Sequence, residues 1–223
     1  MSVTVKICGL TDAPGFDAAV AAGADMVGFV FYPPSPRAIT ADAAAALSAR
    51  HAGGPLRVGL FVDADDDTIA ATLAAVPLDL LQLHGAEPPD RVAAIRRRFG
   101  VPVMKAVGVA TRAEVARAIA DYGAVADRML FDAKPPPAGT PGALPGGNAA
   151  VFDWSVMHGM SVPVPWLLAG GLTPDNVARA IATVSAPGVD VSSGVERARG
   201  VKDPALIRAF VAAAKAASRE GSA

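Results

Sequence analysis

The sequence predicts an α/β fold, a single (β/α)8 barrel of the TIM type that spans residues 1–223 as one domain. Short β-rich runs alternate with alanine-rich amphipathic segments along the whole chain, a pattern typical of parallel strands joined by right-handed crossovers. About eight such units are present, which is the number that closes into a barrel, and 223 residues is an ordinary length for one.

The elements follow one another in strict alternation. The strands are expected at residues 3–7, 26–31, 57–61, 78–83, 103–107, 128–131, 166–169 and 189–191. The helices are expected at 13–22, 41–50, 66–75, 89–99, 112–122, 153–158 (a short one), 175–183 and 204–217. Capping residues introduce several of them, namely Thr11-Asp12, Thr40 with Asp42, Thr111 with Glu114, and Thr173-Pro174-Asp175.

A doubly wound open sheet is the competing architecture. It predicts a glycine-rich phosphate loop after the first strand, whereas Cys8-Gly9-Leu10-Thr11 follows that strand here and the glycine-rich turns come late. The barrel is therefore favoured. One long irregular stretch, residues 133–150, is rich in Pro and Gly, and its position after the sixth strand predicts an active-site cover or a flexible insert.

Composition and charge exclude several classes of protein. The net charge is −1, with 20 basic and 21 acidic residues spread along the chain, so no broad field attracts nucleic acid or anionic lipid. No stretch approaches the ~18–20 apolar residues of a membrane span, and residues 1–6 lack the plan of a signal peptide. The lone cysteine cannot form an internal disulfide. We expect a cytoplasmic protein, either a monomer or a homodimer, that binds a small anionic ligand locally.

The first strand points two polar side chains into the barrel. Alternation places Val3, Val5 and Ile7 beneath the helices and leaves Lys6 and Cys8 on the inner face, with Cys8 at the mouth. An inward Lys6 is expected to favour the thiolate and to lower the pKa of Cys8. The alternative for a lone cysteine is a small buried hydrophobe, but its position beside a turn glycine favours chemistry.

Asp132 closes the sixth strand and has two open interpretations. It either caps the following turn or lies partly desolvated at the rim, where its pKa would rise and it could serve as a general acid. The last two strands predict a phosphate site more directly. Gly170 and Gly171 follow the seventh strand, and adjacent loops at this end of a barrel often cradle a phosphate. The loop after the eighth strand contributes Ser192, Ser193 and Gly194.

Three further side chains are candidates for binding a ligand. Arg37 ends the stiff turn Tyr32-Pro33-Pro34-Ser35-Pro36-Arg37 and is either a surface arginine or an inward fork that suits a carboxylate. Gln82 and His84 share a face of the fourth strand, where they either bond a ligand oxygen or satisfy polar groups of the barrel. No residues have metal-ligand spacing, and no Ser–His–Asp arrangement is indicated.

These segments resemble the phosphoribosylanthranilate isomerase family, in order and over nearly the whole chain. The matching pieces are Val5-Lys6-Ile7-Cys8-Gly9-Leu10-Thr11, Gly28-Phe29-Val30-Phe31, Ser35-Pro36-Arg37, Val58-Gly59-Leu60-Phe61-Val62, Leu81-Gln82-Leu83-His84-Gly85, Leu130-Phe131-Asp132, Phe152-Asp153-Trp154, Leu168-Ala169-Gly170-Gly171-Leu172 and Asp190-Val191-Ser192-Ser193-Gly194-Val195-Glu196. One segment departs from the family: the loop before Phe-Asp-Trp usually reads Gly-Gly-Thr-Gly, and here it reads Gly146-Gly147-Asn148-Ala149.

The resemblance implies an Amadori rearrangement of N-(5-phosphoribosyl)anthranilate in tryptophan biosynthesis, without a metal or an organic cofactor. Asp132 would protonate the furanose ring oxygen, and Cys8 as thiolate would remove the proton from C2′. Arg37 would hold the anthranilate carboxylate. The remaining substrate-binding residues would be Gln82, His84, Asp190 and, for the phosphate, Gly170, Gly171, Ser192, Ser193 and Gly194.

Other barrels remain as alternatives. A sugar-phosphate epimerase or the related histidine-pathway isomerase would bind a similar ligand, but the latter uses two aspartates where this chain has Cys8. A dual-substrate isomerase is disfavoured for the same reason. A noncatalytic barrel that binds a phosphometabolite would not need both Cys8 and Asp132.

Overall fold

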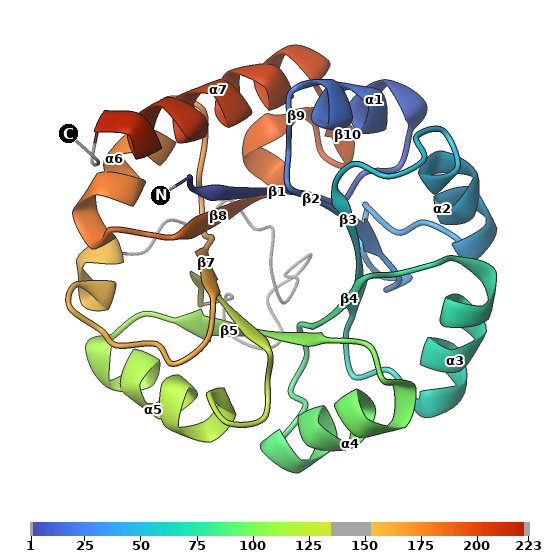
Figure 1. Cartoon of the computed structure of the whole chain (residues 1–223), viewed down its shortest axis with the longest axis horizontal. Helices are drawn as coiled ribbons and strands as arrows, with labels where there is room; N and C mark the ends of the chain where they lie inside the picture. Colours follow the sequence, from blue (N-terminus) through green and yellow to red (C-terminus); the bar gives the residue numbers. More distant parts are fainter. Residues whose placement is uncertain (1, 135–152, 221–223) are drawn as a thin grey trace.

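Eight parallel strands close into a barrel in sequence order, and helices surround it (Figure 1). The computed structural model describes residues 2–134 and 153–220. The strands are β1 Thr4–Cys8, β2 Met26–Val30, β3 Leu56–Phe61, β4 Leu80–Leu83, β5 Val103–Val109, β6 Arg128–Ala133, β7 Trp166–Leu168 and β8 Gly188–Val191. The helices are α1 Ala13–Ala21, α2 Ala41–Ser48, α3 Asp66–Ala75, α4 Pro89–Phe99, α5 Arg112–Tyr122, α6 Val177–Val184 and α7 Pro204–Glu220, with the short 3-10 helices η1 Trp154–Met157 and η2 Ser193–Val195.

The expected alternation along the strands is confirmed. Val3, Val5 and Ile7 belong to the large apolar layer between the strands and the helices. Lys6 is fully buried inside the barrel, and its register partner on the closing strand β8 is Asp190. A second apolar cluster fills the barrel interior, and it consists of Met26, Val58, Leu80, Met104, Ala106, Leu130, Leu167 and Ala169. None of these residues comes from β1 or β8, where Lys6 and Asp190 make the inner face polar.

Most of the predicted helix starts carry the expected caps. The side chains of Asp12 and Thr40 accept backbone N–H groups at the starts of α1 and α2, and Thr111 forms a full capping box with Glu114. The predicted start at Thr173-Pro174-Asp175 is wrong, because α6 begins at Val177.

Asn176 explains that difference. Its side chain accepts the N–H of Thr173 (2.8 Å) and donates to the carbonyl of Gly171 (3.0 Å). The residues between Thr173 and Asn176 therefore form a turn that braces the loop after β7, and the helix starts only beyond it. A second boundary also differs, since β4 begins at Leu80 rather than at residue 78.

An aspartate precedes each of three even-numbered strands and ties it to the strand before. Asp25, Asp79 and Asp127 stand just before β2, β4 and β6. Their carboxylates accept the backbone N–H groups of Val5 (2.7 Å), Arg57 (2.7 Å) and Val103 (2.9 Å). These bonds satisfy donors at the amino-terminal ends of the strands, so this end of the barrel is built for stability.

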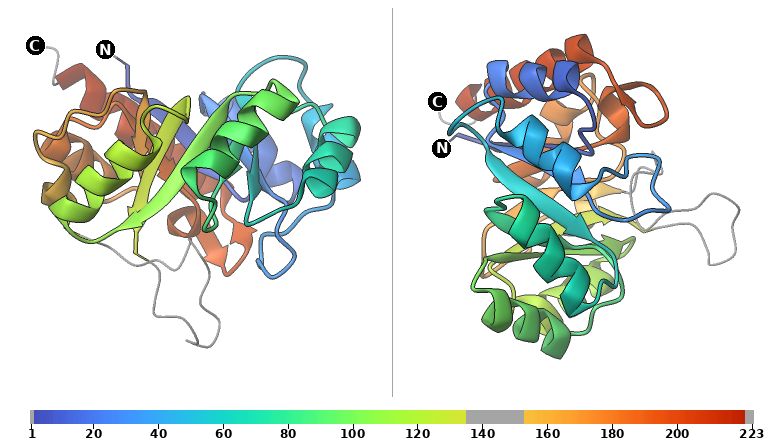
Figure 2. Two further views of the ribbon diagram at one scale, coloured as in Figure 1. Left: turned by 90° about the horizontal axis from the view of Figure 1, so that it is seen from below. Right: turned by 90° about the vertical axis from the view of Figure 1, so that its right-hand side faces the viewer.

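The chain termini lie at one end of the barrel, and the loops that follow the carboxyl ends of the strands lie at the other. Figure 2 shows the termini on one side, with the loop after β2 and a hairpin of β9 (Glu196–Ala198) and β10 (Val201–Lys202) on the other. The sequence did not predict this hairpin. Of the predicted loop at 133–150, only Ala133 and Lys134 are described, and the rest lies outside the described residues. None of the helices within residues 2–134 and 153–220 has both the length and the apolar character that crossing a bilayer requires.

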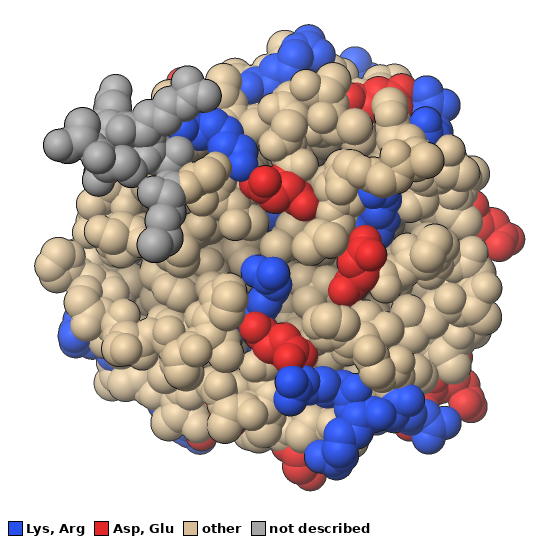
Figure 3. Space-filling view, in the orientation of Figure 1, with Lys and Arg blue, Asp and Glu red and all other residues tan. Residues whose placement is uncertain are grey.

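Charged side chains of both signs are mixed on the face shown in Figure 3. Lys and Arg gather at the bottom of that view, in the region of α4, whose last turn carries Arg96, Arg97 and Arg98. Arg96 and Arg98 form ion pairs with Asp127 (2.6 Å) and Asp66 (3.2 Å). The basic run is therefore a partly neutralised helix end.

Candidate active site

A pocket opens at the carboxyl ends of the strands. Nine of the eleven predicted site residues line it: Cys8, Arg37, Gln82, His84, Asp132, Gly170, Gly171, Asp190 and Ser192. Ser193 and Gly194 are not among the lining residues that the structure describes. They belong to the short helix η2, which directly follows Ser192 in the chain. Residues from seven of the eight strands and their loops thus converge on one cavity, as expected for this end of a barrel.

Cys8 ends β1 and is 4% exposed, at the floor of the pocket. The expected lowering of its pKa is wrong. Burial raises the pKa of the Cys8 thiol, and although Lys6 opposes this, Asp190 adds to it, so the pKa lies above its ordinary value. Lys6 is bound to Asp190 at 2.8 Å, so its positive charge is shared between the carboxylate and the sulfur.

Asp132 lies near the end of β6 and faces the same pocket. Burial raises its pKa to about 7, with Asp190 adding to the rise, while the backbone N–H of Ala133 (2.7 Å) and the charge of Lys6 oppose it. The carboxyl group therefore keeps its proton close to neutral pH. Of the two interpretations of Asp132, the desolvated acid at the rim is the one that the structure supports.

Gln82 on β4 and His84, which directly follows that strand, both line the pocket, as expected from their shared face. Burial, together with the charges of Lys105 and Lys6, lowers the pKa of His84 to about 3, so the imidazole is neutral. Its Nε2 lies 3.6 Å from Asp132 Oδ2, which is too long for a hydrogen bond. Among the described residues, His84 Nε2 and Gln82 Oε1 are buried polar atoms without a partner, an arrangement that suits a ligand.

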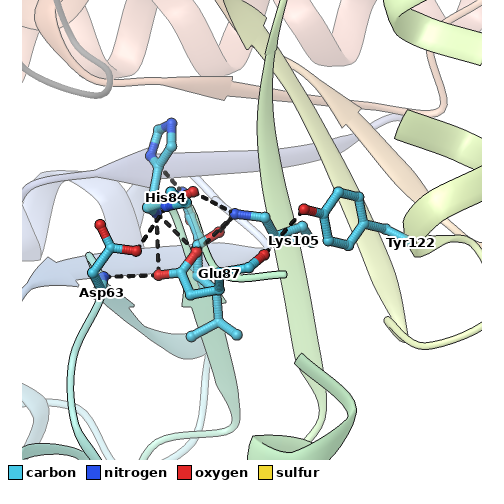
Figure 4. A network of polar contacts seen from close by, with 9 residues as sticks. Asp63, His84, Glu87, Lys105 and Tyr122 are labelled. Atoms are coloured by element: carbon cyan, nitrogen blue, oxygen red, sulfur yellow. Dashed lines mark hydrogen bonds and ion pairs between the residues drawn. The ribbon is translucent and has the colours of Figure 1, made fainter. Parts of the chain in front are cut away.

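A buried ion pair lies beneath His84, and the sequence did not reveal it (Figure 4). Lys105 on β5 contacts Glu87 at 2.7 Å, and both side chains are 2% exposed. Lys105 Nζ also donates to the carbonyls of Gly85 (2.7 Å) and Leu83 (3.4 Å), which flank His84 in the chain. The pair thereby holds the backbone from which the imidazole projects.

The same ion pair joins the loops after β3 and β4 to β5 and α5. Glu87 accepts the N–H groups of Gly85 (2.9 Å) and of Asp63 (2.9 Å) in the loop after β3. Tyr122 at the end of α5 donates its hydroxyl to the Glu87 carbonyl at 3.0 Å, and its ring lies 5.6 Å from Lys105 Nζ. Figure 4 shows these contacts converging on Glu87 and Lys105. We call the group Asp63, Glu87, Lys105 and Tyr122 the β4 clamp.

Arg37 points inward and is 4% exposed, which rejects the surface interpretation. Its guanidinium makes a two-point contact with Glu196, from Nε to Oε1 (2.6 Å) and from Nη2 to Oε2 (3.0 Å). Glu196 in turn accepts from Lys202 Nζ (2.8 Å). Glu196 and Lys202 come from the unpredicted hairpin, and no spacing in the sequence indicated that they meet Arg37.

The loops after β7 and β8 touch each other backbone to backbone. A Cβ on Gly194 would lie 1.8 Å from the carbonyl oxygen of Leu172, so only glycine fits there. Gly170 and Gly171 have φ values of 84° and 62°. The predicted pairing of these two loops is confirmed, and it brings backbone donors without side-chain obstruction to one edge of the pocket.

The arrangement suits proton transfer on a small anion. One wall carries a neutral carboxylic acid, the floor carries a thiol beside an ammonium group, and glycine-rich loops and an arginine lie around them. The described part of the chain holds no group of three or more His, Cys, Asp and Glu side chains that could bind a metal ion.

Comparison with known proteins agrees with this architecture. The family model for "N-(5'phosphoribosyl)anthranilate (PRA) isomerase" matches residues 5–213. An N-(5'-phosphoribosyl)anthranilate isomerase of Paracoccus denitrificans is 58% identical over 216 residues, which is 97% of this chain and 99% of the relative. Another from Rhodospirillum rubrum is 58% identical over 215 residues, 95% of this chain and 97% of the relative.

Solved structures give the same result. The phosphoribosyl anthranilate isomerase of Thermotoga maritima has a TM-score of 0.84 at 38% identity and covers 96% of this chain and 99% of its own. A phosphoribosyl anthranilate isomerase in complex with reduced 1-(o-carboxyphenylamino)-1-deoxyribulose 5-phosphate has a TM-score of 0.80 at 36% identity, with the same two coverages. The chain belongs to the N-(5'-phosphoribosyl)anthranilate isomerase family of tryptophan biosynthesis.

Proposed function

We propose that this chain converts N-(5-phosphoribosyl)anthranilate to 1-(2-carboxyphenylamino)-1-deoxyribulose 5-phosphate, with Asp132 as the general acid and Cys8 as the general base. The observation that carries the proposal is that a carboxyl group with a pKa of about 7 and a thiol line the same pocket. An acid and a base that reach one substrate from different strands can move a proton on and another off without a cofactor.

The reaction begins at the ring oxygen. Asp132 donates its proton to that oxygen, the bond from the oxygen to C1′ breaks, and the nitrogen lone pair forms a protonated Schiff base. The Cys8 thiolate then takes the proton from C2′, and the electrons of that C–H bond form an enolamine and neutralise the nitrogen. Transfer of a proton from the 2′-hydroxyl to C1′ gives the ketone. No electrons enter or leave the substrate.

The base needs help that the acid does not. Burial favours the neutral form of both groups, which is the working form of Asp132 but the resting form of Cys8. Lys6 is the group that favours the thiolate. We therefore assign Lys6 the role of stabilising Cys8 after the thiol has lost its proton.

The two anionic ends of the substrate would orient the sugar between acid and base. Arg37 holds the anthranilate carboxylate, and the backbone donors of Gly170, Gly171, Ser192, Ser193 and Gly194 hold the phosphate. The molecule bound in the related complex carries both anionic groups in its name. His84 Nε2 donates to a ligand oxygen in the tautomer that carries its proton there, Gln82 Oε1 accepts from a ligand hydroxyl group, and Asp190 completes the substrate-binding set.

A coupled assay with phosphoribosylanthranilate tests the proposal. We expect turnover by the wild-type chain, and a loss of kcat of about 10²-fold to 10⁴-fold in both Cys8→Ala and Asp132→Asn, because each variant lacks one proton-transfer group. Thermal unfolding of both variants checks that they remain folded. Retention of most of the activity by either folded variant would remove that residue from its role.

Arg37→Ala tests the carboxylate anchor in the same assay. If Arg37 binds the substrate equally in the ground state and the transition state, the variant raises KM and leaves kcat nearly unchanged. A KM equal to that of the wild type would contradict the assignment.

The proposal includes a cytoplasmic location and a monomeric or homodimeric state. The first is supported by the single free cysteine, which suits a reducing compartment. Sedimentation equilibrium distinguishes the two assembly states by their mass.

A further inference from the structure

Glu196 is buried next to the pocket without lining it. It begins β9, its side chain is 5% exposed, and it accepts from Arg37, from Lys202 and from the backbone N–H of Gly200 (3.0 Å). Among the described residues that line the pocket are Arg37 and Ser192, whereas Glu196 and Lys202 are not among them. Any influence of Glu196 on a ligand must therefore pass through the side chains that it holds.

The contacts in this cluster keep Glu196 ionised although it is buried. Burial alone would raise the pKa of Glu196, but Arg37, Lys202 and the Gly200 N–H lower it to about 2, so the carboxylate is ionised. Glu196 thus contacts two buried cations, the guanidinium of Arg37 and the ammonium of Lys202.

Lys202 extends the cluster to the phosphate loop. Its Nζ donates to the carbonyl oxygen of Ser192 (2.8 Å) and to Ser192 Oγ (3.2 Å), as well as to Glu196. Arg37 comes from the loop after β2, and Ser192 from the loop after β8. A continuous chain of contacts therefore joins the two loops through Glu196.

Gly9 fixes this chain of contacts relative to Cys8. It has a φ of 75°, and a Cβ there would lie 2.7 Å from Arg37 Cδ and 3.2 Å from Ser192 Oγ. The stem of Arg37 and the side chain of Ser192 thus meet over the backbone of the residue that follows Cys8. The loops that carry Arg37 and Ser192 therefore both pack against the end of β1, next to Cys8.

We propose that Glu196 is a positioning residue that links the carboxylate anchor to the phosphate loop, so that the two ends of the substrate are held at one separation across Cys8. The inference rests on the proposed function. Glu196 fixes the plane of the Arg37 guanidinium by its two-point contact and, through Lys202, the position of Ser192.

A double-mutant cycle between Glu196→Gln and Arg37→Ala tests this role, with kcat/KM for phosphoribosylanthranilate as the readout. We expect Glu196→Gln alone to lower kcat/KM tenfold or more, mainly through KM. In the Arg37→Ala background the same change is expected to lower it less than about threefold, because Glu196 can then act only through Lys202 on Ser192. An equal loss in both backgrounds, or no loss in the wild-type background, would overturn the proposal.

A second measurement tests the contact from Glu196 through Lys202 to Ser192 in the phosphate loop. Inorganic phosphate is used as a competitive inhibitor, and we expect its inhibition constant to rise in both Glu196→Gln and Lys202→Met but not in Arg37→Ala. An unchanged constant in Glu196→Gln would show that the phosphate loop does not depend on it. Asp79→Asn is the matched control, since it loses a carboxylate contact to a backbone N–H at the opposite end of the barrel and should leave KM unchanged.

The outcomes separate this inference from the proposed function. Wild-type turnover is measured first, and its absence would count against the proposed function itself. An active wild type with a purely additive cycle would defeat only the role of Glu196. If Glu196→Gln does not fold, Glu196→Asp replaces it in the same cycle, because its side chain is one methylene shorter and so keeps the charge but moves the carboxylate away from the guanidinium.

Discussion

At the scale of single residues, burial raises the pKa values of both Cys8 and Asp132, which helps the reaction at Asp132 and hinders it at Cys8. It raises the pKa of both acids, and Asp190 raises both further. For Asp132 this produces the protonated form that an acid catalyst needs. For Cys8 it disfavours the thiolate, so the ammonium of Lys6, held by Asp190, must act against burial. Burial in one pocket therefore keeps Asp132 protonated, whereas the Cys8 thiolate depends on the charge of Lys6.

The raised pKa of Asp132 predicts a pH-dependent stability difference. A carboxyl group with a pKa of about 7 in the folded state and an ordinary one in the unfolded state makes the folded state bind more protons between those values. Its contribution to the free energy of unfolding therefore falls as pH rises from about 4 to about 7, by on the order of 4 kcal/mol. Asp132→Asn lacks this loss, so it should be more stable than the wild type at pH 8.

Chemical denaturation of the wild type and of Asp132→Asn at pH 4.5 and pH 8 measures this difference. The advantage of the variant should be small at the lower pH and large at the higher one. A variant less stable than the wild type at pH 8 would show that Asp132 is ionised in the folded state without cost.

At the scale of elements, the β4 clamp positions a neutral imidazole by holding the backbone on both sides of it. The contacts of Lys105 to the carbonyls of Leu83 and Gly85 flank His84, and Glu87 secures the lysine. Lys105 also contributes to the low pKa of His84 by its charge. The clamp thus has a structural effect and an electrostatic effect, which can be separated by substitution.

Lys105→Met leaves the buried carboxylate of Glu87 without its cation, so we expect a loss of stability of about 3–5 kcal/mol. The double variant Lys105→Met with Glu87→Gln removes both charges and should recover much of that loss. In both variants the pKa of His84 should be higher than in the wild type, because a nearby positive charge is gone. NMR titration of the imidazole measures it, and an unchanged pKa in the stable double variant would contradict an electrostatic role for Lys105.

The sequence predicted which side chains face the barrel mouth, because that depends on strand periodicity. It did not predict contacts between residues that are far apart in the chain. Cys8 and Asp132 could be placed at the mouth because each ends an expected strand, and the alternation along β1 correctly turned Lys6 inward. Glu196 was matched to the family, but its contact with Arg37 joins residues 159 positions apart. The direction of the Cys8 pKa shift was predicted wrongly because burial outweighs Lys6, and because Asp190, which comes from the distant strand β8, adds to the rise.

The sequence mispredicted the start of α6 and missed the hairpin of β9 and β10. Both depend on side-chain contacts made outside the regular helices and strands. The turn held by Asn176 delayed the start of α6, and the hairpin of β9 and β10 depends on charged contacts made by Glu196 and Lys202 rather than on an apolar pattern. Helix caps succeeded where the cap is local in sequence, as in the capping box of Thr111 and Glu114.

At the scale of the whole molecule, the two ends of the barrel have separate tasks. At the amino-terminal end, the carboxylates of Asp25, Asp79 and Asp127 bind backbone N–H groups. At the other end, buried charges such as Lys6 and Glu196 lie in or beside a pocket, where they are costly for stability but useful for chemistry. Asp79→Asn is therefore expected to lower the melting temperature without changing kcat, and calorimetry together with the coupled assay would reveal a coupling between the ends if kcat fell.

The pH dependence of the whole reaction follows from the paired titrations. In the wild type, the thiolate fraction of Cys8 rises with pH, while the protonated fraction of Asp132 falls above its pKa of about 7. Dividing kcat/KM of the wild type by that of Asp132→Asn cancels the titrations of Cys8 and of the substrate phosphate, which both enzymes share. The ratio should be level below about pH 6 and should fall about tenfold per pH unit above pH 7, because only the protonated form of Asp132 is active. A ratio that stays level up to pH 9 would mean that Asp132 does not act as the acid.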